Sequence, residues 1–327
     1  MEHQIRFPHL GIVLKNVGDG INIGGFEIKY YGMIIATGFL LGLIVSYYAA
    51  RHENKFNPEL VFDYLIAMII PAIVGARLYY VIFSWDYYKN HLSEIIQIRN
   101  GGLAIYGGVI AGAITLYIFC KKKHISMLQF GDVAVKGLLV GQILGRWGNF
   151  FNREAFGSYT NSLFAMQIPT NFFVEHGRID EIISNGLYDK ATYVVSGNEA
   201  ATFIQVHPTF LYESMWNLAL LLLIIFFFTK RKKFDGELIA IYCIGYGIGR
   251  FLIEGLRMDS LMIGSTGIRV SQMLALILAV FGIGWIIYNR RKSRKNHTSK
   301  HEKKGILCTF RKPLLFCAKK HEFLRKN

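Results

Sequence analysis

Charged and amide side chains are concentrated in one short segment, residues 145–157, with the sequence GRWGNFFNREAFG. On a helix of 3.6 residues per turn, Arg146, Asn149 and Arg153 share one face, and Glu154 lies near its edge. The planar N–H donors of arginine suit a phosphate group, and a neighbouring carboxylate can orient the arginine or accept a proton. A structural Arg–Glu pair between helices is the alternative. Five polar side chains in one segment favour a functional site: Arg146, Asn149, Asn152, Arg153 and Glu154.

A second polar segment covers residues 245–259, with the sequence GYGIGRFLIEGLRMD. Arg250, Glu254 and Arg257 are spaced i, i+4 and i+7, which predicts one stripe along one helix. Two arginines can hold a phosphate through several charge-assisted hydrogen bonds, and Glu254 can orient them. A ladder of ion pairs within one helix, at the surface of a membrane, is the alternative. It explains Arg257 well, but it explains Arg250 poorly, because Arg250 lies further inside the apolar run.

Two weaker motifs contain a tyrosine or glutamate in an apolar setting. Residues 207–213 read HPTFLYE and include Glu213, and residues 100–112 read NGGLAIYGGVIAG and include Tyr106. Close helix packing is a sufficient reason for the glycines of the second motif. Tyrosine is also common at membrane interfaces, so Tyr106 and Tyr31 have an alternative explanation as interfacial aromatic residues.

The elements that must position these residues are apolar helices. The chain has 327 residues, of which 52% are hydrophobic, and its mean hydropathy is +0.31. A membrane-spanning helix needs about 20 apolar residues. Seven runs fit this length, at residues 31–50, 61–83, 103–120, 133–151, 210–229, 238–253 and 268–288. The sequence therefore predicts an all-α integral membrane protein whose seven transmembrane helices lie within a catalytic domain of residues 1–290.

Basic flanks orient the predicted helices. They occur at residues 51–55, 121–124, 230–233 and 290–295, and the positive-inside rule places all four in the cytoplasm. The N-terminus and residues 152–207 are then outside. Residues 152–207 are polar, with a turn signal at Asn185-Gly186, and we predict that they form a small folded extracytoplasmic cap. Residues 291–327 are predicted to be a basic cytoplasmic tail.

Charge and cysteine content exclude several functions. Residues 290–327 hold 14 Lys and Arg against 2 Asp and Glu, so they account for +12 of the formal net charge of +15. The basicity thus belongs mainly to a tail, and no nucleic-acid-binding surface is predicted. The four cysteines lack the spacing of a metal site or of a disulfide framework, and we expect neither metal nor cofactor.

With this orientation, polar residues of all seven predicted helices fall in the outer half of the membrane. They are Tyr31, Arg77, Tyr106, Arg146, Asn149, Glu213, Arg250, Glu254, Arg269 and Gln272. Structural polar residues would scatter in depth. Their shared level predicts one polar cavity that opens toward the outer side.

The segment GRWGNFFNREAFG resembles the signature of the prolipoprotein diacylglyceryl transferase family. The resemblance extends, in order, over Tyr31-Gly32, Ala76-Arg77, NGGLAIYGG, HPTFLYE and GRFLIEGLRMD. It implies seven transmembrane helices in a bacterial plasma membrane, with phosphatidylglycerol as the lipid donor. It also implies that the acceptor is the lipobox cysteine of a prolipoprotein signal peptide. The diacylglyceryl group would move to sulfur as a thioether, and glycerol phosphate would leave.

The resemblance also implies roles for individual residues. Arg146 matches the phosphatidylglycerol-binding arginine of the family, and the positions matching residues important for activity are Tyr31, Asn149, Glu154, Gly157, Arg250 and Glu254. We assign Arg146 and Arg250, with Arg257, to the phosphate, Glu254 to orienting Arg250, and Asn149 and Tyr31 to positioning the lipid. Glu154, Glu213 and Tyr106 stay open as candidates for proton transfer. Many family members have histidine where this chain has Tyr106, whose reference pKa of about 10 suits a neutral-pH base poorly.

Two other classes of protein remain alternatives from the residues alone. A transporter would also have several helices with charged residues, but its charges belong at the midplane and its helices usually divide into matching halves. A non-catalytic scaffold that binds lipid or signal peptide is the third class. Product formation from phosphatidylglycerol and a lipobox peptide separates the enzyme from both.

Overall fold

Six long apolar helices dominate the structure, a computed structural model that describes residues 3–98, 101–196, 199–262 and 267–292. Each is long and apolar enough to cross a membrane: α1 (Tyr30–Glu53), α2 (Leu60–Phe83), α4 (Ile105–Lys122), α5 (Met127–Asn152), the helix Thr209–Arg231 and the C-terminal helix Val270–Lys292. The helix Thr209–Arg231 consists of α8 (Thr209–Leu222), the π-helical segment η5 (Leu223–Phe228) and α9 (Thr229–Arg231). The chain is thus a multi-pass membrane protein.

A further long helix, α10 (Glu237–Glu254), differs from these six in composition. Its 18 residues include Glu237, Arg250 and Glu254, so it is not apolar enough to be counted as a span by composition. Both of its glutamates are buried within the protein. Six of the seven predicted spans are therefore supported by length and composition.

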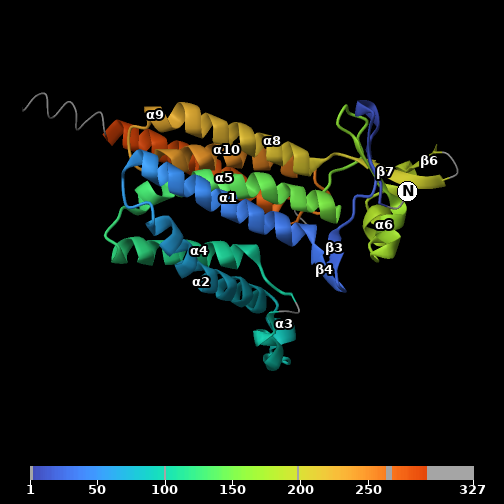
Figure 1. Ribbon diagram of the computed structural model, residues 1–327, viewed down its shortest axis with the longest axis horizontal. Coiled ribbons are helices and arrows are strands. Elements are labelled where there is room, and N and C mark those ends of the chain that lie inside the picture. The colour runs from blue at the N-terminus through green and yellow to red at the C-terminus, as the bar shows by residue number, and fades with distance from the viewer. Residues whose placement is uncertain (1–2, 99–100, 197–198, 263–266, 293–327) are drawn as a thin grey trace, which may run out of the picture.

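The helices form a main bundle with a side pair. α1, α5, α8 and α10 run side by side, and α2 pairs with α4 beside them (Figure 1). Glycine permits the close approach of α1 and α5, because a Cβ at Gly42 would lie only 2.5 Å from the carbonyl oxygen of Gly137. Near Lys122, the α2–α4 pair joins the bundle through a buried cluster of Val61, Phe119 and Phe130.

A five-stranded antiparallel sheet lies at the end of the bundle where α5 ends and α8 begins (Figure 1). Its order is β2 (Ile12–Leu14), β1 (Ile5–Phe7), β5 (Met166–Pro169), β7 (Glu199–Val206) and β6 (Thr192–Ser196). In register, Arg6 faces Gln167, and Met166 faces Val206. The N-terminal segment therefore folds together with the predicted cap.

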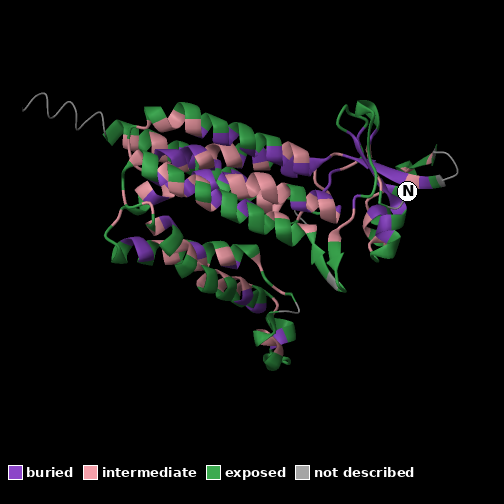
Figure 2. Cartoon of the chain, in the orientation of Figure 1, coloured by how far each residue is buried: buried purple, intermediate pink, exposed green. Residues whose placement is uncertain are grey.

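Short elements follow the ends of the helices: those of residues 85–96 lie beyond the end of α2, apart from the sheet, and the others lie nearer the sheet (Figure 1). They are the hairpin β3 (Gly20–Ile23) and β4 (Phe26–Lys29), the helices α3 (Trp85–Tyr88), α6 (Thr170–Glu175) and α7 (Ile179–Ser184), and the 3-10 turns Pro8–Leu10, Leu92–Ile96 and Tyr188–Lys190. The sheet has a buried core, in which Ile5, Ile168, Phe173 and Ile204 are completely buried (Figure 2). Phe150 of α5 and Phe210 of α8 belong to the same core, so the sheet packs directly on the ends of these helices. The predicted all-α class describes the long helices, and the strands are an addition that the apolar runs do not predict.

The opposite end of the bundle is held by buried ion pairs. Lys136 contacts Glu53 at 2.5 Å, and Lys232 contacts Asp132 at 2.9 Å. Asp132 also accepts hydrogen bonds from two backbone N–H groups at the start of α10. These contacts fix the ends of α1, α5 and α10. The predicted basic tail lies outside the described residues from position 293 onward.

Candidate active site

Glu213 is the centre of a buried ionic cluster that joins three helices. It lies in the first turns of α8, and its side chain is only 5% exposed. One carboxylate oxygen is 2.7 Å from Nε of Arg146 on α5, and the other is 2.5 Å from Nη1 of Arg250 on α10. The arginines of the two strongest sequence motifs are therefore held by a single carboxylate. From the sequence, Glu213 is a candidate for proton transfer, and its bridging position between the two arginines comes only from the structure.

Arg250 has a second acidic partner. Its Nη2 lies 2.7 Å from Oε2 of Glu254, which is one turn further along α10 and is buried. Arg269, at the start of the last helix, donates a hydrogen bond to the backbone carbonyl of Glu254. Glu254 is therefore paired with Arg250, and the last helix contributes to the same cluster.

Arg257 is placed differently from the prediction. The predicted stripe of Arg250, Glu254 and Arg257 along one helix is wrong for Arg257, because α10 ends at Glu254. Arg257 donates two hydrogen bonds to Asp259, at 2.9 and 2.7 Å, and its Nη1 is 3.8 Å from Glu213. Although burial alone raises the pKa of Asp259, its hydrogen bonds from Arg257 bring that pKa below the ordinary value. The Nε and Nη2 groups of Arg257 are thus already engaged by a carboxylate of the protein.

The signature segment turns back on itself to reach the cluster. α5 ends at Asn152, and Arg153 adopts the left-handed conformation with φ 47°. Glu154 then returns to Asn149: its amide donates to the Asn149 carbonyl at 3.1 Å, and its carboxylate accepts from Asn149 Nδ2 at 2.7 Å. Asn149 also accepts from Arg146 at 3.4 Å. The prediction that Arg153 continues the face of Arg146 is therefore wrong, because the helix has already ended.

Gly157 lies between two other segments of the site. Its amide donates to the carbonyl of His207 at 2.9 Å, and the next amide, of Ser158, donates to Leu256 at 3.0 Å. A Cβ at Gly157 would lie 2.8 Å from the Cβ of His207 and 2.9 Å from the carbonyl oxygen of Leu256. Only glycine fits this position, so the structure gives Gly157 a packing role.

Tyr31, near the start of α1, packs on the same stretch of α5. The space beside Gly148 is filled by its ring, since a Cβ at Gly148 would be 2.8 Å from a ring carbon of Tyr31. Gly148 lies between Trp147 and Asn149, and the Tyr31 side chain is partly exposed. Tyr31 therefore packs on the stretch of α5 that carries Arg146 and Asn149, and part of its side chain is exposed.

Tyr106 and Arg77 lie away from this cluster. Tyr106 is on α4, and its ring is 6.2 Å from that of Tyr79 on α2. Arg77 donates to backbone carbonyls after α2, including those of Ile95 and Gly101, so it orders its own connection. Within the described residues, no contact joins either side chain to Arg146, Glu213 or Arg250. The prediction that all seven helices contribute to one polar centre is wrong for α2 and α4.

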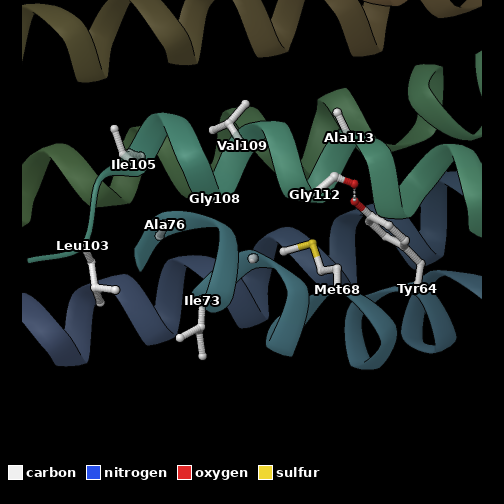
Figure 3. A pocket seen from close by; sticks show the side chains of 11 residues that line it. Tyr64, Met68, Ile73, Ala76, Leu103, Ile105, Gly108, Val109, Gly112 and Ala113 are labelled. Carbon is white, nitrogen blue, oxygen red and sulfur yellow. Dashed lines mark hydrogen bonds between the residues drawn. The ribbon is translucent and has the colours of Figure 1, made fainter. Parts of the chain in front are cut away.

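An apolar groove of about 450 Å³ lies between α2 and α4 (Figure 3). Leu103, Ile105 and Gly108 lie toward one end of it, and Tyr64 lies at the other end, where its hydroxyl donates to the carbonyl of Gly112 at 3.0 Å. The groove is lined by apolar and small side chains apart from Tyr64. It is separate from the ionic cluster.

The charges of the ionic cluster balance. Its contacts link four arginines (Arg146, Arg250, Arg257 and Arg269) with four carboxylates (Glu154, Glu213, Glu254 and Asp259). An anion that enters this cluster therefore adds uncompensated charge unless a carboxylate moves aside or takes up a proton. Among the described residues, no group of three or more His, Cys, Asp or Glu side chains could hold a metal ion.

The fold and the site define a multi-pass membrane protein with a buried arginine–carboxylate cluster at the sheet end of its bundle. The profile of the prolipoprotein diacylglyceryl transferase family matches residues 20–288. The chain belongs to this family and is therefore a transferase.

Curated relatives are similar in sequence to this chain over most of its length. A phosphatidylglycerol–prolipoprotein diacylglyceryl transferase of Finegoldia magna is 42% identical over 262 residues, which cover 80% of this chain and 91% of the relative. Proteins of the same name from Listeria welshimeri and Streptococcus uberis are 43% and 40% identical. Each match covers 83% of this chain, with 89% of the Listeria protein and 95% of the Streptococcus protein.

Proposed function

We propose that this protein transfers the diacylglyceryl group of phosphatidylglycerol to the lipobox cysteine thiol of prolipoproteins. A bond forms between the cysteine sulfur and the diacylglyceryl carbon, and the bond from that carbon to the phosphate oxygen breaks. Glycerol phosphate leaves with the bonding electron pair, and the thiol proton passes to an acceptor in the site. Family membership and the names of the relatives support the reaction. The observation that carries the assignment to this cluster is the convergence of Arg146 and Arg250, from two helices, on one carboxylate.

The phosphodiester binds, in this proposal, by exchange with Glu213. Both carboxylate oxygens of Glu213 occupy arginine N–H groups that a phosphate would need. Two phosphate oxygens can replace them, because arginine forms the same charge-assisted, directional hydrogen bonds with either anion. The exchange leaves one extra negative charge in the cluster, which is compensated when Glu213 takes up a proton. Arg146 and Arg250 then stabilise the negative charge that develops on the leaving phosphate.

The released Glu213 is the best-placed candidate for accepting the thiol proton. A cysteine thiol has a reference pKa of about 8.5 and needs a proton acceptor as it attacks. In this scheme Glu213 remains beside the bound phosphate after exchange, whereas the Glu154 carboxylate is already engaged by a hydrogen bond from Asn149. Tyr106 lies on the α2–α4 pair and is not needed in this scheme. Asn149 and Tyr31 position the lipid, and Arg257 contributes positive charge behind Glu213.

We further propose that α10 is the seventh transmembrane helix. Its charged residues do not have to face lipid, because Glu237 and Glu254 are buried and Arg250 pairs within the bundle. The sheet end, with the N-terminal segment and residues 152–207, would then lie outside the bacterial plasma membrane. The basic flanks at residues 51–55, 121–124 and 230–233 would lie in the cytoplasm together with residues 291–327, as the positive-inside rule requires.

The test is product formation with purified protein. Phosphatidylglycerol and a peptide with a lipobox cysteine are supplied, and the peptide is followed by mass spectrometry. The proposal expects the peptide to gain a diacylglyceryl group on sulfur. Binding of both substrates without product would identify a scaffold, and movement of lipid without product would identify a transporter.

Arg146→Lys tests the assignment of the site. Lysine keeps the charge but loses the two-donor edge, so the rate should fall by about 10²-fold, as on removal of one oriented donor. Arg290→Lys is the matched control, because Arg290 pairs with Glu237 at the opposite end of the bundle. If Arg146→Lys had the activity of the parent, Arg146 would not bind the phosphate, and its role would be that of a structural partner of Glu213.

A further inference from the structure

Arg153 is a completely buried arginine that the proposed reaction does not use. Its side chain is 1% exposed. It donates to the carbonyl oxygens of Val17 and, at 3.3 Å, of Phe151, and its guanidinium lies 4.1 Å from the ring centre of Phe172. Its Nε has no hydrogen-bond partner among the described residues, and no described carboxylate lies within ion-pair distance. Burial lowers the pKa of Arg153 to about 10, so the group is still charged at neutral pH.

The backbone of Arg153 is also in an unfavourable conformation. Its φ of 47° lies in the left-handed region, which glycine adopts readily and branched-chain or long residues adopt at a cost. The carboxylates of Asp19 and Glu175 act on the Arg153 charge only at longer range. A buried charge without a direct ion pair and a left-handed backbone are each costly. Both occur at the one residue that separates the end of α5 from Glu154.

The left-handed turn is what returns Glu154 to Asn149. With Arg153 in this conformation, the Glu154 amide reaches the Asn149 carbonyl at 3.1 Å, and the Glu154 carboxylate reaches Asn149 Nδ2 at 2.7 Å. Asn149 in turn contacts Arg146. A change in this turn would therefore move Glu154 and Asn149 relative to Arg146.

The far end of the Arg153 side chain is fixed to the N-terminal segment. Val17 is itself held, since its amide donates to the carbonyl of His3 at 2.7 Å. Two residues later, the carbonyl of Asp19 accepts from the amide of Tyr30, at the start of α1, at 2.9 Å. The guanidinium thus connects the end of α5 to a segment that is anchored both near the sheet and on α1.

We propose that Arg153 is a positioning residue for the transferase reaction: it ties the turn after α5 to the N-terminal segment and so holds Glu154 against Asn149. The inference rests on the proposed function. It assigns the N-terminal segment a part in ordering the site, although that segment lies more than 100 residues from the signature in the chain.

Arg178 provides the matched control. It donates to the carbonyls of Asn152 and Arg153, at 3.1 and 3.2 Å, and so caps the same helix end. Unlike Arg153, it pairs with Glu181 at 2.8 Å and is 29% exposed. Arg178→Lys therefore perturbs the same turn without touching the link to Val17, and we expect its rate to stay within about threefold of the parent.

The test combines Arg153→Gly with Glu154→Ala in the full chain. Glycine relaxes the left-handed backbone, so only the loss of the side-chain link remains. We expect turnover of the lipobox peptide to fall by about 10-fold or more, because small misplacements of site residues cost rate. If Arg153 acts through Glu154, the double variant should be no slower than Glu154→Ala alone, within about twofold.

The outcomes separate the inference from the proposed function. The positioning role would be overturned if the two losses of rate multiplied in the double variant, or if Arg153→Gly were fully active. In both cases the parent protein would still form the thioether. No thioether from the parent itself would instead overturn the proposed function. Arg153→Lys, which keeps the charge and can reach one carbonyl, replaces the glycine variant if that variant does not fold. If neither variant folds, Arg153 is required for stability alone and the inference fails.

Discussion

Replacing Gly157 by alanine tests whether its close contacts shape the site. The new Cβ would lie 2.8 Å from the Cβ of His207 and 2.9 Å from the carbonyl oxygen of Leu256. Carbon atoms in contact are normally about 3.5–4.0 Å apart, so the segments must separate by roughly 0.7 Å or more. Both neighbours are fixed by backbone hydrogen bonds to the Gly157–Ser158 segment, and they cannot move independently.

This separation has a cost in stability and in activity. Overpacking of a tight contact typically costs about 1–3 kcal/mol. Leu256 directly precedes Arg257, whose Nη1 lies 3.8 Å from Glu213, so the displacement passes to the ionic cluster. We expect Gly157→Ala to lower the unfolding temperature and to reduce the rate of thioether formation by about 10-fold or more.

Thermal unfolding in detergent and the mass-spectrometric peptide assay measure the two effects. Gly141→Ala is the control, because a Cβ at Gly141 meets only the Gly38 carbonyl oxygen, at 3.9 Å, an ordinary contact. Alanine also favours the helix at that position. If Gly157→Ala kept both the stability and the rate of the parent, the close approach would not constrain the site, and the packing role of Gly157 would be refuted.

Two further substitutions test the remaining assignments. Glu213→Gln removes the charge that competes with phosphate between Arg146 and Arg250, so phosphatidylglycerol should bind at least as tightly while turnover falls by about 10²-fold or more; weaker lipid binding in a vesicle pull-down would contradict the exchange. Tyr106→Phe should change turnover by less than about threefold, because its hydroxyl has no described contact with the cluster and its ring can still pack near Tyr79; a 10²-fold loss would show that the α2–α4 pair closes on the site during the reaction.

The sequence by itself determined the class of the protein and pointed to most of the residues that meet in the ionic cluster. Long apolar runs near 20 residues allow only membrane-spanning helices, because their backbone groups must be satisfied within the segment. Arginines and carboxylates within such runs identify functional positions, because a charge in a membrane requires a partner. These are local properties, and they located Arg146, Asn149, Arg250 and Glu254.

The tertiary structure decided how these residues meet. No spacing in the sequence indicates that Glu213, on a third helix, supplies the carboxylate shared by Arg146 and Arg250. Helical periodicity also gave wrong positions beyond the ends of helices. It placed Arg153 and Arg257 on helical faces, but α5 ends at Asn152 and α10 ends at Glu254. Glycine usually signals a left-handed turn, and an arginine in that conformation gives no such signal.

The pairing of the strands and the placement of the α2–α4 pair were also decided by tertiary contacts. β1 and β5 are separated by more than 150 residues, and strands as short as theirs become stable only when they pair. The position of Tyr106 in the first turn of α4 follows from the sequence, but its distance from the cluster depends on how α4 packs. Position along a helix is set by that helix alone, whereas lateral position is set by contacts between helices, and only the folded chain contains those contacts.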